Sequence, residues 1–107
     1  MAVNDSKSLA HMVFFTLNDR SPAAQDALIE ACQKYLNDHP GTEVFHVGRR
    51  AEAYQRPVND ADHDVALVIV FSSAADHDRY QESARHQQFI AENQACWAMV
   101  RVFDALV

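Results

Sequence analysis

The sequence predicts an α+β fold of the ferredoxin-like type, in which two helical regions pack on a four-stranded antiparallel sheet. Two observations lead to this fold. Four segments rich in β-branched and aromatic residues and two regions of helical periodicity follow one another in the order β-α-β-β-α-β. The chain has 107 residues, of which 49% are hydrophobic, enough for one modest core. We expect an N-terminal tail over residues 1–8 and a single domain over residues 9–107.

The first half of the chain predicts a strand, a helix and a second strand. His11–Leu17 (HMVFFTL) is apolar on both faces, as is typical of a buried strand. Ser21 and Pro22 supply a helix cap and a first helical residue, and Asn37–Gly41 ends the helix. Val44–Gly48 then forms a shorter strand. The helix has one apolar stripe, made of Ala24, Leu28, Ala31, Cys32 and Tyr35.

The second half predicts a long loop, a strong strand and a divided helical region. Arg49–Asp64 is polar and forms the loop, and Val65–Phe71 (VALVIVF) is the clearest strand of the chain. Ser73 starts a short helix that ends near Tyr80, and a further helical piece covers Arg85–Ala95. The side chains expected on one face of this last piece are His86, Phe89, Ile90, Asn93 and Trp97.

Both faces of the expected central strands are apolar. The first and third strands are central in this fold, and Met99–Leu106 supplies the fourth strand. Met12 and Phe14 point away from Val13 and Phe15, yet all four are apolar. Because the helices cover only one face of the sheet, the other face needs a cover from outside the chain. A symmetric homodimer through the sheet faces is the simplest such cover.

Composition excludes several classes of function. Nine basic and fifteen acidic residues give a net charge of −6, which argues against nucleic acid and anionic membranes as partners. No apolar run has the length of a membrane span. Cys32 and Cys96 are too few for a disulfide framework, so we expect a cytoplasmic protein. Two glycines leave no room for a glycine-rich phosphate loop, and no common catalytic motif is present.

We expect neither a bound metal nor a cofactor. Asp60, Asp62 and Asp64 alternate as at the start of a calcium loop. However, Val65 and Phe71 occupy the positions where such a loop needs glycine and glutamate. A solvated acidic loop is the favoured interpretation.

Two histidines and a tyrosine are the candidate chemical groups. His11 begins the first strand in phase with its apolar side chains, and His86 lies on the apolar face of a helix. Tyr80 stands six residues before His86. An imidazole is a natural general base near neutral pH, and a phenol can donate a hydrogen bond to a carbonyl or an enolate. The alternative is a pair of core side chains joined by a structural hydrogen bond.

These features together resemble the stress-responsive alpha/beta-barrel (Dabb) family. The resemblance runs from about Leu9 to Leu106 and rests on the order and spacing of short motifs. The motifs are the opening HMVFFTL, Pro40-Gly41, Gly48, VALVIVF, the Tyr80-x5-His86 segment with Phe89, and the terminal VRVFDAL. The resemblance implies a ferredoxin-like protomer that closes into a dimeric α/β barrel.

The resemblance also implies a site. A plant member of the family is a polyketide cyclase that needs no cofactor, and its catalytic histidine and tyrosine match His86 and Tyr80. A first-strand histidine in its cavity matches His11. The remaining expected substrate-binding residues are Val13, Phe15, Leu28, Leu67, Ile69, Phe89 and Trp97, with Val100 and Val102 as further apolar lining.

One departure from the family bears on the geometry. Family members often have a His-Pro pair between the tyrosine and the histidine, and this chain has Ser83 and Ala84 there. Without that proline, the helix is free to continue unbroken, which would change the direction of Tyr80.

We therefore expect a cofactor-independent cyclase- or lyase-like enzyme that uses a His/Tyr pair on a small apolar or aromatic ligand. A non-catalytic dimeric stress-response or ligand-binding module is the first alternative. A cofactor-free monooxygenase-like protein is the second.

Overall fold

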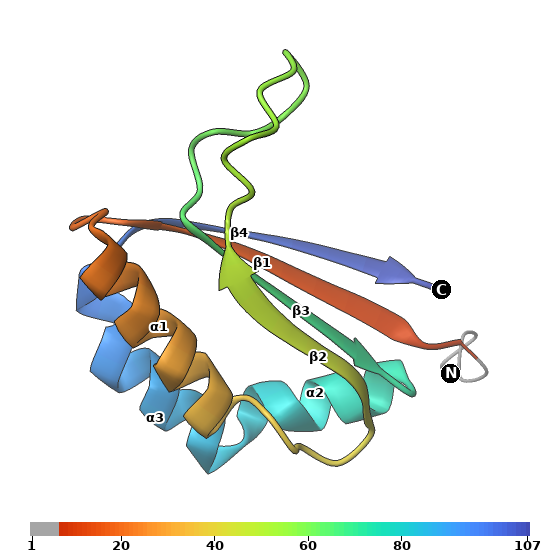
Figure 1. Cartoon of the computed structure of the whole chain (residues 1–107). Helices are drawn as coiled ribbons and strands as arrows, with labels where there is room; N and C mark the ends of the chain where they lie inside the picture. Colours follow the sequence, from red (N-terminus) through yellow and green to blue (C-terminus); the bar gives the residue numbers. More distant parts are fainter. Residues whose placement is uncertain (1–6) are drawn as a thin grey trace.

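A four-stranded antiparallel sheet forms one layer of the molecule and three helices form the other (Figure 1). The computed structural model describes residues 7–107, so most of the predicted tail lies outside the described residues. The strands lie in the order β2-β3-β1-β4, with β1 and β3 central as predicted. The elements are β1 (Leu9–Leu17), α1 (Pro22–Tyr35), β2 (Thr42–Arg49), β3 (Val65–Phe71), α2 (Ala74–Glu82), α3 (Ala84–Asn93), a short 3-10 turn (Gln94–Cys96) and β4 (Trp97–Leu106). The predicted fold class is confirmed.

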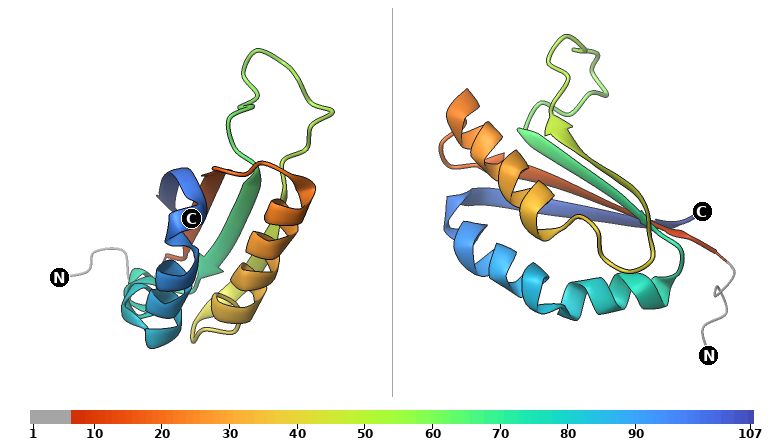
Figure 2. Two further views of the ribbon diagram at one scale, coloured as in Figure 1. Left: turned by 90° about the vertical axis from the view of Figure 1, so that its left-hand side faces the viewer. Right: turned by 60° about the horizontal axis from the view of Figure 1, so that its bottom comes forward.

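All three helices pack on the same face of the sheet (Figures 1 and 2). Alternate side chains of β1 and β3 point into this layer and are buried, as the pleat of a strand dictates. The core between the layers contains Val13, Phe15, Leu28, Cys32, Leu67, Ile69, Phe71, Tyr80 and Phe89. Within residues 7–107, no helix has the length and apolar character needed to cross a membrane.

The opposite face of the sheet has no helix over it and remains apolar. The side chains of Met12, Phe14, Val68 and Val70 are half-buried there. Phe103 of β4 pairs with Met12 across the strands and is 50% exposed. This face is therefore the apolar surface that the sequence predicts.

Ser83 breaks the second helical region, so the alternative of an unbroken helix is wrong. Its backbone is extended (ψ 151°), which ends α2 and starts α3 at the same residue. The Ser83 hydroxyl accepts a hydrogen bond from the His86 backbone N–H (3.2 Å) and donates one to the Tyr80 carbonyl (2.8 Å). A serine cap thus makes the break without a proline.

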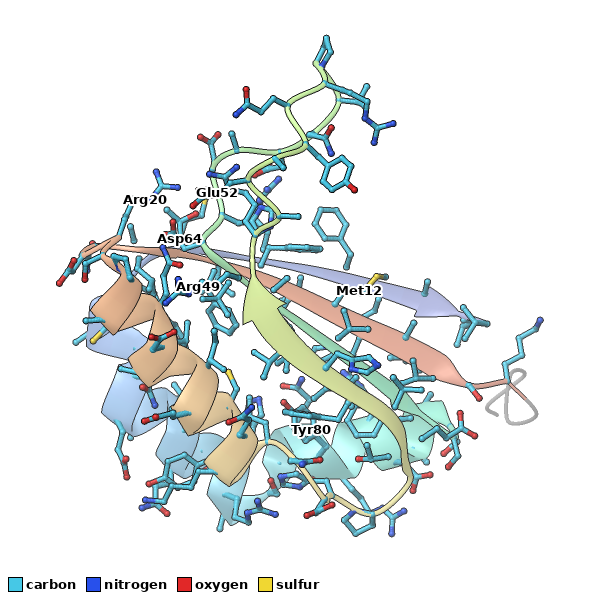
Figure 3. The ribbon with its side chains drawn as sticks, in the orientation of Figure 1. Met12, Arg20, Arg49, Glu52, Asp64 and Tyr80 are labelled. Atoms are coloured by element: carbon cyan, nitrogen blue, oxygen red, sulfur yellow. The ribbon has the colours of Figure 1, made fainter. Side chains whose placement is uncertain are left out.

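Two further details differ from expectation. Trp97 was expected on a helical face, but it is the first residue of β4 because the chain leaves the helix through the 3-10 turn. Asp64 was expected in a solvated loop, but it is only 6% exposed. Its carboxylate accepts hydrogen bonds from the Leu17 backbone N–H and from Arg20, both at 2.9 Å (Figure 3). Asp64 therefore anchors the long loop to the end of β1.

Candidate functional site

A cavity of about 190 Å³ lies between the sheet and helices α2 and α3. Apolar side chains make up most of its wall, and imidazole, phenol and indole groups also reach it. Its lining consists of His11, Val13, Phe15, Leu36, Leu67, Tyr80, Gln81, His86, Phe89, Ile90, Trp97, Val100 and Val102. A mostly apolar hollow with a few polar groups is typical of a small-molecule site.

The α2–α3 junction brings Tyr80 and His86 together. Tyr80 is the last buried residue of α2, and its side chain lies between that helix and the sheet (Figure 3). The rings of Tyr80 and His86 meet edge-on, with centroids 4.8 Å apart and planes at 74°. His39 packs on the Tyr80 ring at 90°, with centroids 4.9 Å apart. Contacts with two neighbouring imidazole rings therefore hold the phenol at the cavity wall.

Two side chains that line this cavity each contain a buried nitrogen with no hydrogen-bond partner among the described residues. These nitrogens are Nδ1 of His86 and Nε1 of Trp97. A buried polar atom without a partner costs about 1–3 kcal/mol, and such atoms are rare in native structures. An indole N–H only donates, whereas a neutral imidazole nitrogen either donates or accepts. The indole N–H of Trp97 could donate to an acceptor atom of a ligand, and the imidazole nitrogen of His86 could accept an acidic hydrogen from it.

His11 enters the cavity wall from the central strand β1 and is 3% exposed. Its Nδ1 lies 2.6 Å from Oδ1 of Asp104 on β4. Its Nε2 lies 3.5 Å from the side-chain nitrogen of Gln81. The carboxylate holds the imidazole ring in one orientation, as acidic partners of functional histidines do.

Burial controls the protonation of these groups. Desolvation, with smaller contributions from His11, His39 and His77, lowers the pKa of His86 to about 4. Desolvation also lowers the pKa of His11, and the Asp104 carboxylate opposes that shift. Burial raises the pKa of the Tyr80 hydroxyl above its ordinary value. At neutral pH the site therefore presents a proton-accepting His86 imidazole and a proton-donating Tyr80 phenol.

Ten of the twelve residues proposed from the sequence line the cavity: His11, Val13, Phe15, Leu67, Tyr80, His86, Phe89, Trp97, Val100 and Val102. Leu28 instead lines a second hollow of about 330 Å³ near Cys96 and the end of β1. Ile69 is fully buried in the core and does not reach the cavity. The larger hollow has no imidazole or phenol in its wall, so the chemistry points to the smaller one.

The structure adds lining residues that the sequence did not suggest. Leu36, Gln81 and Ile90 reach the cavity. Asp104 contacts Nδ1 of His11 without lining the cavity itself. Gln81 follows Tyr80 directly, so it could have been found from its neighbour. Asp104 pairs with His11 across β1 and β4, a register that only the folded sheet reveals.

Comparison with known proteins agrees with this architecture. The model of the stress responsive A/B barrel domain, Dabb, matches residues 9–107. The chain belongs to the Dabb family. No curated protein matches the sequence.

Solved structures share the fold of this Dabb domain at low sequence identity. A Dabb protein from Mesorhizobium loti with a ferredoxin-like fold is 19% identical, with a TM-score of 0.78 over 94% of this chain and 97% of that chain. A hydroxynitrile lyase from Passiflora edulis is 19% identical, with a TM-score of 0.76 over 95% and 94% of the two chains. A dimeric ferredoxin-like protein of unknown function from Thermobifida fusca is 17% identical, with a TM-score of 0.76 over 95% and 92%.

Proposed function

We propose that this Dabb domain is a cofactor-independent enzyme that moves a proton on a small apolar or aromatic carbonyl compound. The observation that carries the proposal is that two side chains lining one apolar cavity, His86 and Trp97, each have a buried nitrogen, Nδ1 and Nε1, without a hydrogen-bond partner among the described residues. A carbonyl oxygen would satisfy the indole N–H, and a C–H next to that carbonyl would face the imidazole.

The proposed step is proton abstraction. A neutral ring nitrogen of His86 takes the proton from the carbon beside the carbonyl. The electron pair of that C–H bond forms the C=C bond of the enolate, and the π pair of the carbonyl moves onto its oxygen. Tyr80 and Trp97 donate hydrogen bonds to the resulting enolate oxygen. The negative charge that develops raises the low pKa of His86 during the step. His86 then returns the proton to the product, and His11 positions the substrate.

The fold relatives support a catalytic role without defining the reaction. One of them is a hydroxynitrile lyase, so a barrel of this kind can carry enzymatic chemistry. A cyclase that forms a bond at the carbon beside a carbonyl would begin with the same proton transfer. None of the described site residues specifically favours the monooxygenase alternative.

The active unit in this proposal is a homodimer of the domain at residues 9–107, joined through the sheet faces. The uncovered apolar face of β1, β3 and β4 supports this arrangement, as do relatives described as dimeric. The helix layer, and with it the cavity, stays outside that contact.

A hydrogen-exchange assay tests the enzymatic proposal without knowledge of the natural substrate. The protein is incubated in D₂O with phenylacetone and related small aryl ketones, and loss of the α-hydrogen signal is followed by NMR. We expect exchange faster than the buffer rate for wild type, and loss of that acceleration in His86→Ala. His46→Ala, which alters a histidine on β2 away from the cavity, is the matched control.

Two outcomes would contradict the proposal. Acceleration that survives in His86→Ala would reject the assigned base. Ketones that bind to wild type but exchange only at the buffer rate would favour the non-catalytic binding module.

A further inference from the structure

A second group of polar side chains gathers where β1, α2 and β4 meet, beside the cavity. His11, His77 and Asp104 each place one potential metal-ligand atom within 4.8 Å of the other two. They come from three elements that are far apart in the sequence. Among residues 7–107, no other group of three or more histidine, cysteine or acidic side chains has its potential ligand atoms this close together.

The three side chains differ in how firmly they are held. His11 is buried in a central strand, and its Nδ1 lies 2.6 Å from Asp104 Oδ1. The His77 ring stacks obliquely near it, with centroids 4.9 Å apart. Asp104 lies on the edge strand β4, and its side chain is 41% exposed. The cluster thus joins the buried imidazole of His11 to a mostly buried imidazole, His77, and to a partly exposed carboxylate, Asp104.

The surroundings of the two imidazoles are also polar. Nε2 of His11 and Nε2 of His77 lie 3.5 and 3.4 Å from the same side-chain nitrogen of Gln81. The Nδ1 atom of His77 lies 3.1 Å from the Asp78 carboxylate. Carboxylates that orient imidazoles in this way are typical outer-shell partners of metal-binding histidines.

We propose that His11, His77 and Asp104 form a binding site for a divalent transition-metal ion such as Zn²⁺. Two imidazole nitrogens and one carboxylate oxygen suit Zn²⁺, Co²⁺ or Ni²⁺ rather than Mg²⁺ or Ca²⁺, which prefer oxygen ligands. The ion takes the place of the proton that His11 and Asp104 share, and His77 supplies the third ligand. Water from the exposed side of Asp104 completes the coordination.

The required rearrangement is small. Ligand atoms around a tetrahedral Zn²⁺ are roughly 3.3 Å apart, given bonds of about 2.0–2.1 Å. The atoms already lie within 4.8 Å, and rotation of the His77 and Asp104 side chains can close the difference. The partial exposure of Asp104 also gives the ion an entry path from solvent.

This site shares His11 with the proposed substrate site, but the proposed proton transfer itself uses no metal. A bound ion would hold the His11 ring and change the polar end of the cavity. Zn²⁺ is therefore expected to inhibit the exchange reaction if that reaction occurs, but the test of the site rests on binding alone.

The test is a titration of the full chain with Zn²⁺ by isothermal calorimetry after treatment with EDTA. Co²⁺ is added in parallel, because its visible absorption reports imidazole and carboxylate ligation. We expect saturable binding of one ion per chain. His77→Ala and Asp104→Asn should each weaken binding at least tenfold. Circular dichroism of each variant is the check that it is folded.

His63→Ala is the matched control. His63 also pairs with an aspartate, Asp60, at 3.1 Å, but it belongs to the long loop and not to the cluster. It should leave the affinity for Zn²⁺ unchanged. Absence of saturable binding to wild type would overturn the proposal, as would binding that His77→Ala and Asp104→Asn leave intact.

Discussion

The protonation state of His86 follows from its position at the cavity wall. Burial removes water from the ring, and three other histidines add like charge nearby, so the pKa falls to about 4. At neutral pH the His86 ring is therefore almost wholly neutral. The lower pKa also makes it a weaker base than a free imidazole, so the proposed proton transfer depends on the negative charge that develops on the substrate.

This shift predicts a specific loss of stability in acid. The unfolded chain protonates His86 near pH 6.5, whereas the folded chain protonates it only near pH 4. Between these values the unfolded state binds more protons, so the free energy of unfolding falls as the pH falls. Urea unfolding at several pH values measures this dependence. His86→Gln should flatten it between pH 6.5 and 4, and an unchanged slope would contradict the low pKa.

At the residue scale the sequence showed the candidates but not all their partners. The six-residue spacing of Tyr80 and His86 is visible in the sequence across two helical pieces, and the structure places both residues on the cavity. Asp104 could not be linked to His11, because the strand register that pairs them depends on the whole sheet. The unsatisfied indole nitrogen of Trp97 likewise exists only once the core is packed.

The α2–α3 junction is the element that sets the geometry of the site. Ser83 caps α3 through the His86 N–H and contacts the Tyr80 carbonyl, so one hydroxyl touches the backbone of both candidate catalytic residues. Helical periodicity predicted helices on either side of this point, but it could not fix the break. The break depends on a single extended residue, and serine is compatible with either conformation.

Ser83→Ala is predicted to lower both the stability of the fold and the rate of the exchange reaction, whereas a control cap variant should lower the stability alone. Loss of the cap should cost about 1 kcal/mol of unfolding free energy. It should also slow the ketone exchange reaction, because Tyr80 and His86 lose their common anchor. Ser21→Ala is the control: Ser21 caps α1 through the Ala24 N–H, away from the cavity.

The comparison uses urea unfolding and the exchange assay on both variants. We expect similar losses of stability and a loss of exchange rate in Ser83→Ala only. Equal exchange rates in the two variants would show that the junction does not position the pair.

On the scale of the whole molecule, the sheet has one face covered by helices and one apolar face without a cover. The apolar content of both strand faces was readable from the sequence, and the strand order followed from the βαββαβ pattern. The cavity was less predictable. Leu28 belongs to the apolar stripe of α1, but α1 lines the other hollow, and only Leu36, which follows the helix, reaches the cavity.

Charge placed on the uncovered face should dissociate the proposed dimer. Met12→Glu puts a carboxylate at the centre of this face, opposite Phe103, where burial in a dimer would be costly. Light scattering after size-exclusion chromatography should show a dimer for wild type and a monomer for Met12→Glu. Val58→Glu, on the exposed long loop, should remain dimeric. A monomeric wild type, or a Met12→Glu dimer, would contradict the arrangement.

The central claim is that the cavity binds a carbonyl compound through its unpartnered nitrogens. Trp97 is the only tryptophan of the chain, so an NMR spectrum of ¹⁵N-labelled protein has a single indole N–H resonance that reports on Nε1 directly. Titration with phenylacetone should shift this resonance saturably. Propylbenzene, which lacks the carbonyl, should shift it far less. An indole resonance that phenylacetone leaves in place, or that both compounds move equally, would contradict the account.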